Sequence, residues 1–194
     1  MRLNLARTLP RSAVNGPGER FVVWVQGCPI ACPGCWNRDT WAFEGRDLRS
    51  VGDLAADILA TDGIEGVTLT GGEPFAQAKA LAELATRVRA AGLSVLVFSG
   101  YDLDELRRPE HLALLAVTDV LVAGRYVEER RVSGWMLRGS TNQRIHFLSE
   151  RYSHADMDEL AEVEFHVGKD GTLTVTGFPA AAGLLRGWWL ADEE

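Results

Sequence analysis

The sequence predicts an α/β fold, either a partial (β/α) barrel or an open, mainly parallel sheet. Short apolar runs rich in β-forming residues alternate with segments of helical periodicity, as in parallel strands joined by right-handed crossovers. Three of these runs are followed at once by a loop rich in glycine or cysteine. The chain of 194 residues is too short for a full eight-unit barrel, which takes about 250 residues, and fits one domain.

The expected strands are short apolar runs bounded by turn-forming residues. They comprise residues 21–25, 67–70, 93–98 and 119–122. The first is preceded by residues 13–20, which are rich in glycine, contain Pro17 and read as a loop. Because the runs are almost free of polar residues, both faces of the strands are expected to be covered.

The expected helices alternate with these strands and carry apolar residues at helical spacing. They comprise residues 50–59, 76–91 and 103–116. Ser50 is suited to cap the first of them, with Asp53 in the capping-box position. Gly92 is placed to end the second helix, and Pro109 to interrupt the third.

The last third of the chain has a different pattern. Residues 156–161 are expected to be helical, and residues 164–167 and 172–176 flank the turn signal Lys169-Asp170-Gly171, which predicts a hairpin. Residues 180–190, with Trp188 and Trp189, are expected to form a helix. We therefore expect a single domain over residues 1–194, with a core at about 20–126 and a C-terminal extension at about 127–194.

Composition and charge favour an ordinary globular protein. Hydrophobic residues make up 46% of the chain and charged residues 24%, and the formal net charge is −7. So acidic a chain has no general attraction to nucleic acid or to an anionic membrane, and neither is expected as a partner. Met1 to Pro10 lack the apolar core of a signal peptide, and no apolar run could span a bilayer, so a cytoplasmic location is expected.

The cysteines are the most informative residues. All three, Cys28, Cys32 and Cys35, lie in one short stretch, whereas a disulfide framework would spread them along the chain. Soft thiolates select zinc or iron–sulfur clusters. A loop with proline and glycine can wrap one side of a cubane cluster, and three thiolates would leave one iron open to a substrate.

A structural zinc site is the alternative for these cysteines. It would need a fourth ligand, for which the chain offers only histidines. The candidates are His111, His146, His154 and His166. No second cysteine or histidine knuckle is present in the sequence, which favours the cluster.

Two further loops follow expected strands. Thr70-Gly71-Gly72-Glu73-Pro74 combines paired glycines, which allow a close approach to the backbone, with a carboxylate that could accept hydrogen bonds from an ammonium group. Taken alone, it could equally be a tight strand-to-helix turn. Ser99-Gly100-Tyr101 is the second such loop. Ligands of parallel sheets bind beyond the carboxyl ends of strands, so these loops and the cysteines are expected to form one site.

The pairing of Cys-x3-Cys-x2-Cys with a later Gly-Gly-Glu-Pro resembles the radical S-adenosylmethionine superfamily. The resemblance implies a 4Fe–4S cluster on Cys28, Cys32 and Cys35. It also implies that the open iron binds the amino and carboxylate groups of S-adenosylmethionine, which is cleaved to a 5′-deoxyadenosyl radical. Such chemistry belongs to the cofactor, which the protein orients and shields.

Within that superfamily the chain looks most like the activating enzymes of glycyl radical enzymes, above all those of anaerobic ribonucleotide reductases. The similar segments are Cys32-Pro-Gly-Cys-Trp-Asn37, Asn37-Arg-Asp-Thr-Trp41, Ser99-Gly-Tyr101, Asp119-Val-Leu-Val122, Arg138-Gly-Ser-Thr-Asn-Gln-Arg-Ile145 and Thr176-Gly-Phe-Pro179. They span roughly residues 21–179. One departure is Ala123, where the reductase activators commonly carry an acid.

The resemblance assigns the catalytic and metal-binding role to the three cysteines and implies further ligand contacts. Those expected to bind cofactor are Gly34, Trp36, Asn37, Gly71, Gly72, Glu73, Pro74, Ser99, Tyr101 and Arg125. In this reading the Gly-Gly-Glu segment holds the methionine amino group, and Arg125 pairs with the methionine carboxylate. Trp36 could instead belong to the core, and Tyr101 could simply pack at a helix start. Asn142, Gln143 and Arg144 could anchor cofactor or partner, or satisfy backbone groups in a loop.

The leading functional hypothesis is an activase that generates a glycyl radical on a partner such as an anaerobic ribonucleotide reductase. A flavodoxin or ferredoxin would supply the electron. The second hypothesis is a stand-alone radical enzyme acting on a small metabolite, sugar or peptide, which Ala123 and the tail after Pro179 favour. The third is a non-catalytic iron–sulfur or zinc-binding module.

Overall fold

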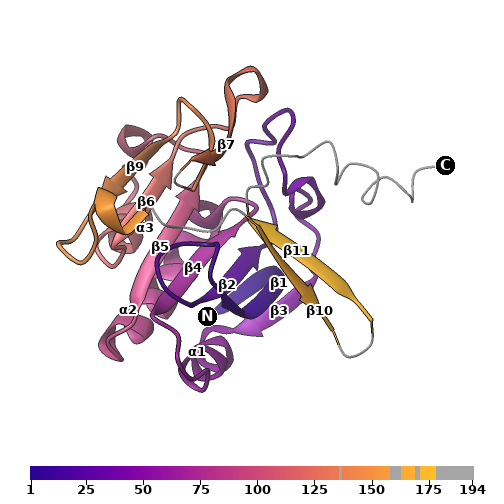
Figure 1. Cartoon of the computed structure of the whole chain (residues 1–194). Coiled ribbons are helices and arrows are strands. Elements are labelled where there is room, and N and C mark those ends of the chain that lie inside the picture. Colours follow the sequence, from indigo (N-terminus) through magenta and orange to yellow (C-terminus); the bar gives the residue numbers. More distant parts are fainter. Residues whose placement is uncertain (136, 158–162, 169–170, 178–194) are drawn as a thin grey trace.

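The protein is a mixed α/β structure built on one seven-stranded sheet, seen in a computed structural model (Figure 1). The structure describes residues 1–135, 137–157, 163–168 and 171–177. The strand order is β3-β1-β2-β4-β5-β6-β9. The central strands are parallel, as predicted, whereas the barrel character that the prediction allowed is not confirmed.

The four predicted strands form the parallel centre of the sheet. They are β2 (Arg20–Val25), β4 (Gly66–Gly71), β5 (Ser94–Ser99) and β6 (Val120–Ala123). Their register places Val23 beside Leu69, Leu69 beside Val97 and Val97 beside Leu121. All four of these side chains are fully buried, which explains why the sequence shows apolar runs.

The antiparallel margins of the sheet were not predicted. β1 (Arg2–Ser12) pairs with both β2 and β3 (Asp47–Ser50), and β9 (Arg144–Phe147) pairs with β6. Leu3 and Leu5 are the buried apolar residues of β1, whose remaining sequence is largely polar and includes Pro10. Such a strand depends on its neighbours rather than on its own propensity.

The helices follow the prediction with two refinements. They are α1 (Val51–Leu59), α2 (Ala78–Ala90) and α3 (Pro109–Leu115). The Ser50 hydroxyl accepts a hydrogen bond of 3.0 Å from the backbone N–H of Asp53, so the predicted cap of α1 is confirmed. The 3-10 turns η2 (Pro74–Gln77) and η3 (Leu103–Glu105) replace the first turns of the other two predicted helices. Pro109 stands at the first turn of α3, where its missing N–H costs nothing.

Both faces of the sheet are covered, but in different ways. Within the described residues, α1, α2 and α3 all pack on one face. Leu137, Tyr152 and Met157 of the C-terminal extension cover Leu96 and Val122 on the other.

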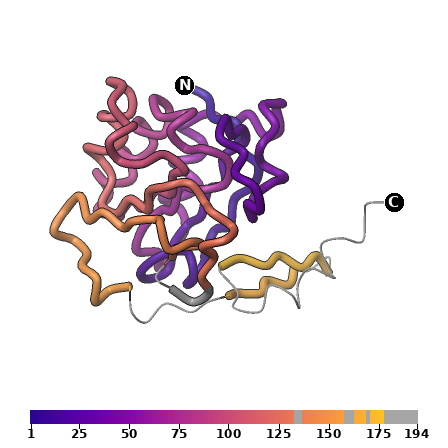
Figure 2. The backbone as a smooth tube through the Cα atoms, turned by 90° about the horizontal axis from the view of Figure 1, so that it is seen from above, coloured from indigo at the N-terminus to yellow at the C-terminus, as the bar shows by residue number. Residues whose placement is uncertain are grey.

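The C-terminal extension contains two small ribbons. β7 (Arg131–Trp135) pairs with β8 (Arg138–Ser140), and the predicted hairpin is confirmed as β10 (Val163–Val167) with β11 (Leu173–Gly177). Figure 2 shows this hairpin beside the main body of the molecule. The predicted helix 156–161 overlaps η5 (His154–Met157), and its remainder and the predicted helix 180–190 lie outside the described residues. No helix within the described ranges is long and apolar enough to cross a membrane.

Candidate active site at the carboxyl edge of the sheet

The loops after β2, β4, β5 and β6 are linked by hydrogen bonds at one edge of the sheet. The backbone N–H of Glu73 donates to the Gly27 carbonyl over 2.9 Å, which joins the second loop to the first. The Gly100 N–H donates to the Glu73 carboxylate over 2.8 Å. The Gly124 N–H donates to the carbonyls of Ser99 and Tyr101 over 3.1 and 3.0 Å. The structure thus brings together the loops that the sequence singled out.

The cysteine loop is closed at its base by two backbone hydrogen bonds. Gly27 N–H donates to the Thr40 carbonyl over 2.8 Å, and Cys28 N–H donates to the Trp41 carbonyl over 3.0 Å. The returning side is the 3-10 turn η1 (Arg38–Thr40). Ala31 and Gly34 have φ values of +49° and +72°, so the chain turns sharply between the cysteines. A short closed loop of this kind keeps the three thiols in one region.

The thiols of Cys32 and Cys35 each lie against hydrogen-bond donors. The backbone N–H of Tyr126 faces Cys32, and the backbone N–H of Asn37 and the indole of Trp41 face Cys35. Burial raises the pKa of both thiols, and these donors oppose that effect. Binding of a metal group as thiolates would therefore release protons.

Two contacts place the cysteine loop over its neighbours. A Cβ at Gly100 would lie 2.7 Å from Ile30, so this isoleucine rests on the loop after β5. A Cβ at Gly34 would lie 2.7 Å from the Glu128 carboxyl group, in the 3-10 turn η4 (Glu128–Arg130). Neither Ile30 nor Glu128 was predicted as a site residue, because both contacts join segments far apart in the chain.

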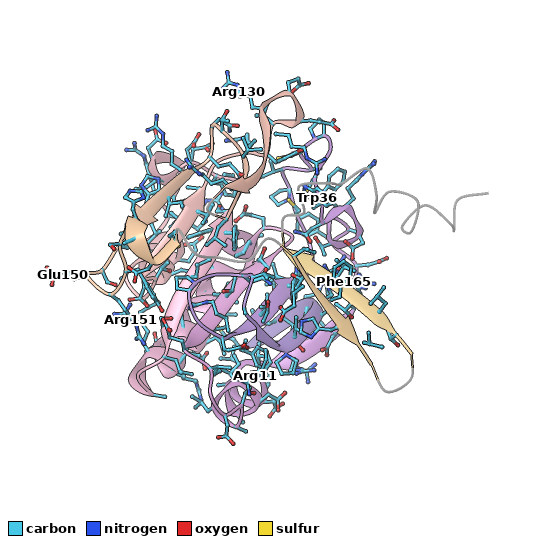
Figure 3. The ribbon with its side chains drawn as sticks, viewed as in Figure 1. Arg11, Trp36, Arg130, Glu150, Arg151 and Phe165 are labelled. Atoms are coloured by element: carbon cyan, nitrogen blue, oxygen red, sulfur yellow. The ribbon has the colours of Figure 1, made fainter. Side chains whose placement is uncertain are left out.

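Trp36 is not a core residue, so that alternative is wrong. Its side chain is 42% exposed, and the Arg131 guanidinium lies 4.6 Å above its ring. Figure 3 shows Trp36 on the side of the molecule between Arg130 and Phe165. Asn37 ends the cysteine segment, and its carbonyl accepts hydrogen bonds from the Thr40 N–H and hydroxyl.

The paired glycines are required by packing between loops. Gly71 has a φ of +97°, and a Cβ there would lie 2.7 Å from the backbone nitrogen and oxygen of Val25. A Cβ at Gly72 would lie 2.3 Å from the Gly27 carbonyl oxygen. A side chain at Gly71 would push the turn away from the end of β2, and one at Gly72 would push it away from the cysteine loop. The local geometry is that of the tight turn considered above, with Pro74 opening η2.

Glu73 ties this turn to the loop after β5. Its buried carboxylate accepts hydrogen bonds from Phe75 N–H at 2.9 Å, Ser99 Oγ at 3.0 Å and Gly100 N–H at 2.8 Å. Burial raises the pKa of Glu73 to about 7, although the three donors favour the ionised form. A carboxylate offers about four acceptor positions, so one is left for a ligand.

The hydroxyl of Ser99 both donates and accepts a hydrogen bond within the protein. It donates to Glu73 and accepts the Tyr101 N–H over 3.0 Å, so it orients the carboxylate. The Tyr101 ring stacks on His111, with centroids 6.5 Å apart, while the Arg125 guanidinium lies 5.9 Å from its centre. Tyr101 thus packs against α3 while bordering the site.

Arg125 is paired with Glu105 on the surface. The guanidinium donates to both carboxylate oxygens, at 2.6 and 2.9 Å, and this bond lowers the pKa of Glu105 to about 2. Both side chains are exposed, and exposed ion pairs contribute little free energy. The guanidinium can therefore exchange this carboxylate for one on a ligand.

Asn142 and Gln143 form hydrogen bonds with backbone groups, which was the alternative to a role in anchoring cofactor or partner. Asn142 Nδ2 donates to the Arg125 carbonyl over 2.8 Å, and Gln143 Nε2 donates to the Gly124 carbonyl over 2.9 Å. Both residues thereby fix the loop after β6, while Arg144 is exposed at the start of β9. Ala123 is fully buried at the end of β6 and offers no acid to the site.

A site for one metal ion is not preformed. Among the residues that the structure describes, no three His, Cys, Asp or Glu side chains meet as ligands of a single ion. The zinc alternative with a histidine ligand therefore finds no support there. A four-iron cluster is larger than one ion and accepts thiolates that are spread over a wrapping loop.

Comparison with known proteins decides between a zinc site and an iron–sulfur cluster. The family described as a 4Fe-4S single cluster domain matches residues 14–146. The anaerobic ribonucleoside-triphosphate reductase-activating protein of Escherichia coli K12 is 32% identical over 154 residues, which cover 75% of this chain and 99% of that protein. The proteins of the same name from Vibrio cholerae and phage T4 are 36% and 34% identical and are covered to 97% and 93%.

The chain belongs to this family of activating proteins. Its matched 4Fe-4S domain contains the cysteine loop and all four loops of the site, but not the β10–β11 hairpin. Among solved structures, QueE from Escherichia coli aligns with a TM-score of 0.44 at 20% identity, over 52% of this chain and 53% of that one.

The side chains of this family member fit an iron–sulfur cluster. The donor set of three thiols is of the soft kind that such clusters take. The indole Nε1 of Trp41 is buried without a hydrogen-bond partner beside Cys35, where a thiolate would accept a hydrogen bond from its N–H. Trp41 was part of a recognised motif, but the sequence did not reveal which cysteine it faces.

Proposed function

We propose that this chain is a radical S-adenosylmethionine activase. Cys28, Cys32 and Cys35 hold a 4Fe–4S cluster with one open iron, and the loops at the carboxyl edge of the sheet bind S-adenosylmethionine. The chemistry that such a bound cluster supplies is the one-electron reduction of the sulfonium, which yields methionine and a 5′-deoxyadenosyl radical. The radical abstracts a hydrogen atom from a backbone glycine of a partner enzyme.

The observation that carries this proposal is the contact between the cysteine loop and the Gly-Gly-Glu turn. The Glu73 N–H donates to Gly27, and Gly72 leaves no space for a side chain beside the same carbonyl. A ligand held at the cysteine loop would therefore lie close to the turn. This arrangement suits a molecule with adjacent amino and carboxylate groups.

The protein residues have distinct parts in this proposal. The free acceptor position of Glu73, with the glycine carbonyls, receives the methionine ammonium group, while Ser99 and Pro74 hold the carboxylate and the turn in place. Arg125 leaves Glu105 to pair with the methionine carboxylate. Gly34 and Trp36 border the adenine, Asn37 the cluster, and Tyr101 the ribose.

The proposed partner is an anaerobic ribonucleoside-triphosphate reductase, because the relatives that cover most of this chain are named as activators of that enzyme. A flavodoxin or ferredoxin is the proposed electron donor. A second candidate function, a stand-alone radical enzyme, is favoured by Ala123, since this position offers no acid at the end of β6.

The test starts from the protein reconstituted anaerobically with iron and sulfide. Dithionite and S-adenosylmethionine are added, and 5′-deoxyadenosine is quantified with and without the reductase encoded in the same genome. We expect product from the wild type and none from Cys32→Ala, and a glycyl radical signal in electron paramagnetic resonance when the reductase is present.

The alternatives predict different results. Product without any radical on the reductase would favour a stand-alone enzyme. A fully reduced cluster that yields no 5′-deoxyadenosine, even with the reductase, would favour a binding module. Tight binding of zinc in place of iron would count against the whole proposal.

A further inference from the structure

Trp41 carries a polar atom that no group of the described protein satisfies. Its indole Nε1 is buried and lacks a hydrogen-bond partner. Buried donors are rarely left unpaired, because a donor that loses its hydration without gaining an acceptor destabilises the fold. An unpaired donor beside a candidate cofactor site therefore points to a ligand as its acceptor.

The position of this indole is fixed by the cysteine loop itself. The backbone carbonyl of Trp41 accepts a hydrogen bond from the Cys28 N–H over 3.0 Å. The backbone N–H of Trp41 donates to the Arg38 carbonyl over 3.2 Å. The Arg38 guanidinium lies 5.4 Å from the centre of the ring. Trp41 is therefore anchored to the first cysteine by its backbone and held in orientation by its neighbour.

The indole faces the third cysteine. It lies beside the Cys35 side chain, yet it makes no full hydrogen bond with the neutral thiol. A neutral thiol is a weak acceptor, whereas a metal-bound thiolate carries negative charge and accepts more strongly. The missing partner would thus appear when the cysteine binds a metal group.

The donors around the other sulfur atoms are of a different kind. Cys32 receives the backbone N–H of Tyr126, and Cys35 also receives the backbone N–H of Asn37. Backbone donors are present whatever the side chain. The donor of Trp41 belongs to its side chain, so a substitution at position 41 can remove it.

We propose that Trp41 is a positioning residue that donates an indole N–H···S hydrogen bond to Cys35 of the bound cluster and raises the reduction potential of the cluster. Reduction adds negative charge to the cluster, and a donor at a ligand sulfur stabilises that charge. The inference rests on the proposed cluster ligands, but not on cleavage of S-adenosylmethionine.

The experiment compares the wild type with Trp41→Phe, which keeps an aromatic ring but removes the N–H. Both are reconstituted anaerobically, their iron and sulfide are quantified, and the cluster is titrated electrochemically without S-adenosylmethionine. We expect a roughly tenfold lower equilibrium constant for reduction in Trp41→Phe, which is about 59 mV for a one-electron couple. Trp24→Phe, the same substitution on β2 at a ring that lies 4.7 Å from the Arg7 guanidinium, is expected to keep the wild-type potential.

A second variant guards against loss of the loop structure. Benzothienylalanine at position 41 has the shape of tryptophan with sulfur in place of the N–H, and it is expected to lower the potential in the same way. A wild-type potential in this variant, with a full complement of iron, would overturn the proposal. An intact cluster in Cys35→Ala would also overturn it, because Cys35 would then not be a ligand.

These results stay separate from the proposed function. A lowered potential in both Trp41 variants supports the role of the indole, even if the wild type yields no 5′-deoxyadenosine. Conversely, an active wild type whose potential does not depend on the N–H would leave the activase intact and remove only the role of Trp41.

Discussion

The two ends of the parallel strands each bury a charged side chain, but they use it differently. At the amino ends, Arg20 is fully buried and donates to the hydroxyls of Thr68, Ser94 and Tyr152 and to the carbonyls of Pro17 and Val67. At the carboxyl ends, Glu73 accepts three hydrogen bonds and keeps acceptor capacity in reserve.

The amino end is a closed network with a structural purpose. Tyr152 belongs to the C-terminal extension, and its hydroxyl bonds to both Glu65 and Ser94. Arg20 therefore links the extension to the sheet. Burial lowers the pKa of Arg20, and the interactions with Tyr152 and Glu65 oppose that effect. The carboxyl end instead leaves the Trp41 indole without a hydrogen-bond partner and the three thiols without a disulfide, within the described residues. Completed polar groups stabilise a fold, whereas incomplete ones can receive a ligand.

The largest expected effect comes from breaking the closed end. Arg20→Met should lower the free energy of unfolding by about 3–4 kcal/mol, because several buried hydroxyl and carbonyl groups lose their donor. Urea unfolding followed by tryptophan fluorescence measures this change. Arg87→Met is the matched control, since Arg87 forms only an exposed pair with Glu83 on α2, worth about 0.5 kcal/mol or less.

The comparison also predicts what Arg20→Met leaves intact. The folded variant should take up as much iron and sulfide as the wild type, because its network lies at the opposite end of the strands from the cysteine loop. A loss of cluster in proportion to the loss of stability would show that the two ends are not independent.

At the carboxyl ends of the strands, Gly72→Ala should disturb the site strongly, although it adds only one methyl group. The new methyl group would meet the Gly27 carbonyl, so the turn and the cysteine loop must separate, at a cost of about 1–3 kcal/mol. We expect the iron content after reconstitution to fall well below that of the wild type. Full iron content with an unchanged unfolding curve would mean that the contact between the two loops is dispensable.

Glu73→Gln tests how the buried carboxylate contributes. At pH 5 the variant should be less stable by about 1 kcal/mol, since the amide nitrogen cannot accept a hydrogen bond from a backbone N–H. The pKa of Glu73 is raised from 4.5 to about 7 in the folded chain. The folded state therefore binds a proton that the unfolded state releases in this window, and wild-type stability falls as the pH rises from 4.5 to 7.

The glutamine variant lacks this titration. The difference in unfolding free energy between the wild type and the variant should therefore shrink between pH 5 and pH 8. Unfolding free energies of the metal-free proteins at several pH values provide the measurement. A difference that stays constant over this range would contradict the raised pKa of Glu73.

The smallest effect is expected away from both ends. Gly52 lies on the exposed side of α1, and a Cβ there would meet nothing closer than the Ser50 hydroxyl at 3.7 Å. Gly52→Ala should therefore stabilise the protein by about 0.5–1 kcal/mol through helix propensity, with no change in cluster content. Destabilisation on thermal unfolding would be at odds with the open surroundings of this glycine.

The sequence by itself determined the features that depend on local pattern. Apolar runs located β2, β4, β5 and β6, because strands buried on both faces leave a continuous signal. Ser50 predicted the start of α1 through capping, and Pro109 predicted an interruption at the point where α3 begins. The three cysteines and the glycine loops were visible because each lies within a few residues, directly after a strand.

Only the tertiary structure decided the contacts between distant segments. β1, β3 and β9 join the sheet by pairing with strands elsewhere in the chain, and their own composition does not predict this pairing. The bonds of Arg20 to Tyr152, of Ser99 to Glu73 and of Arg125 to Glu105 likewise join residues that are 20 to 132 positions apart. Sequence periodicity reports which face of an element is buried, but the partner of a polar group is set by where the whole chain places it.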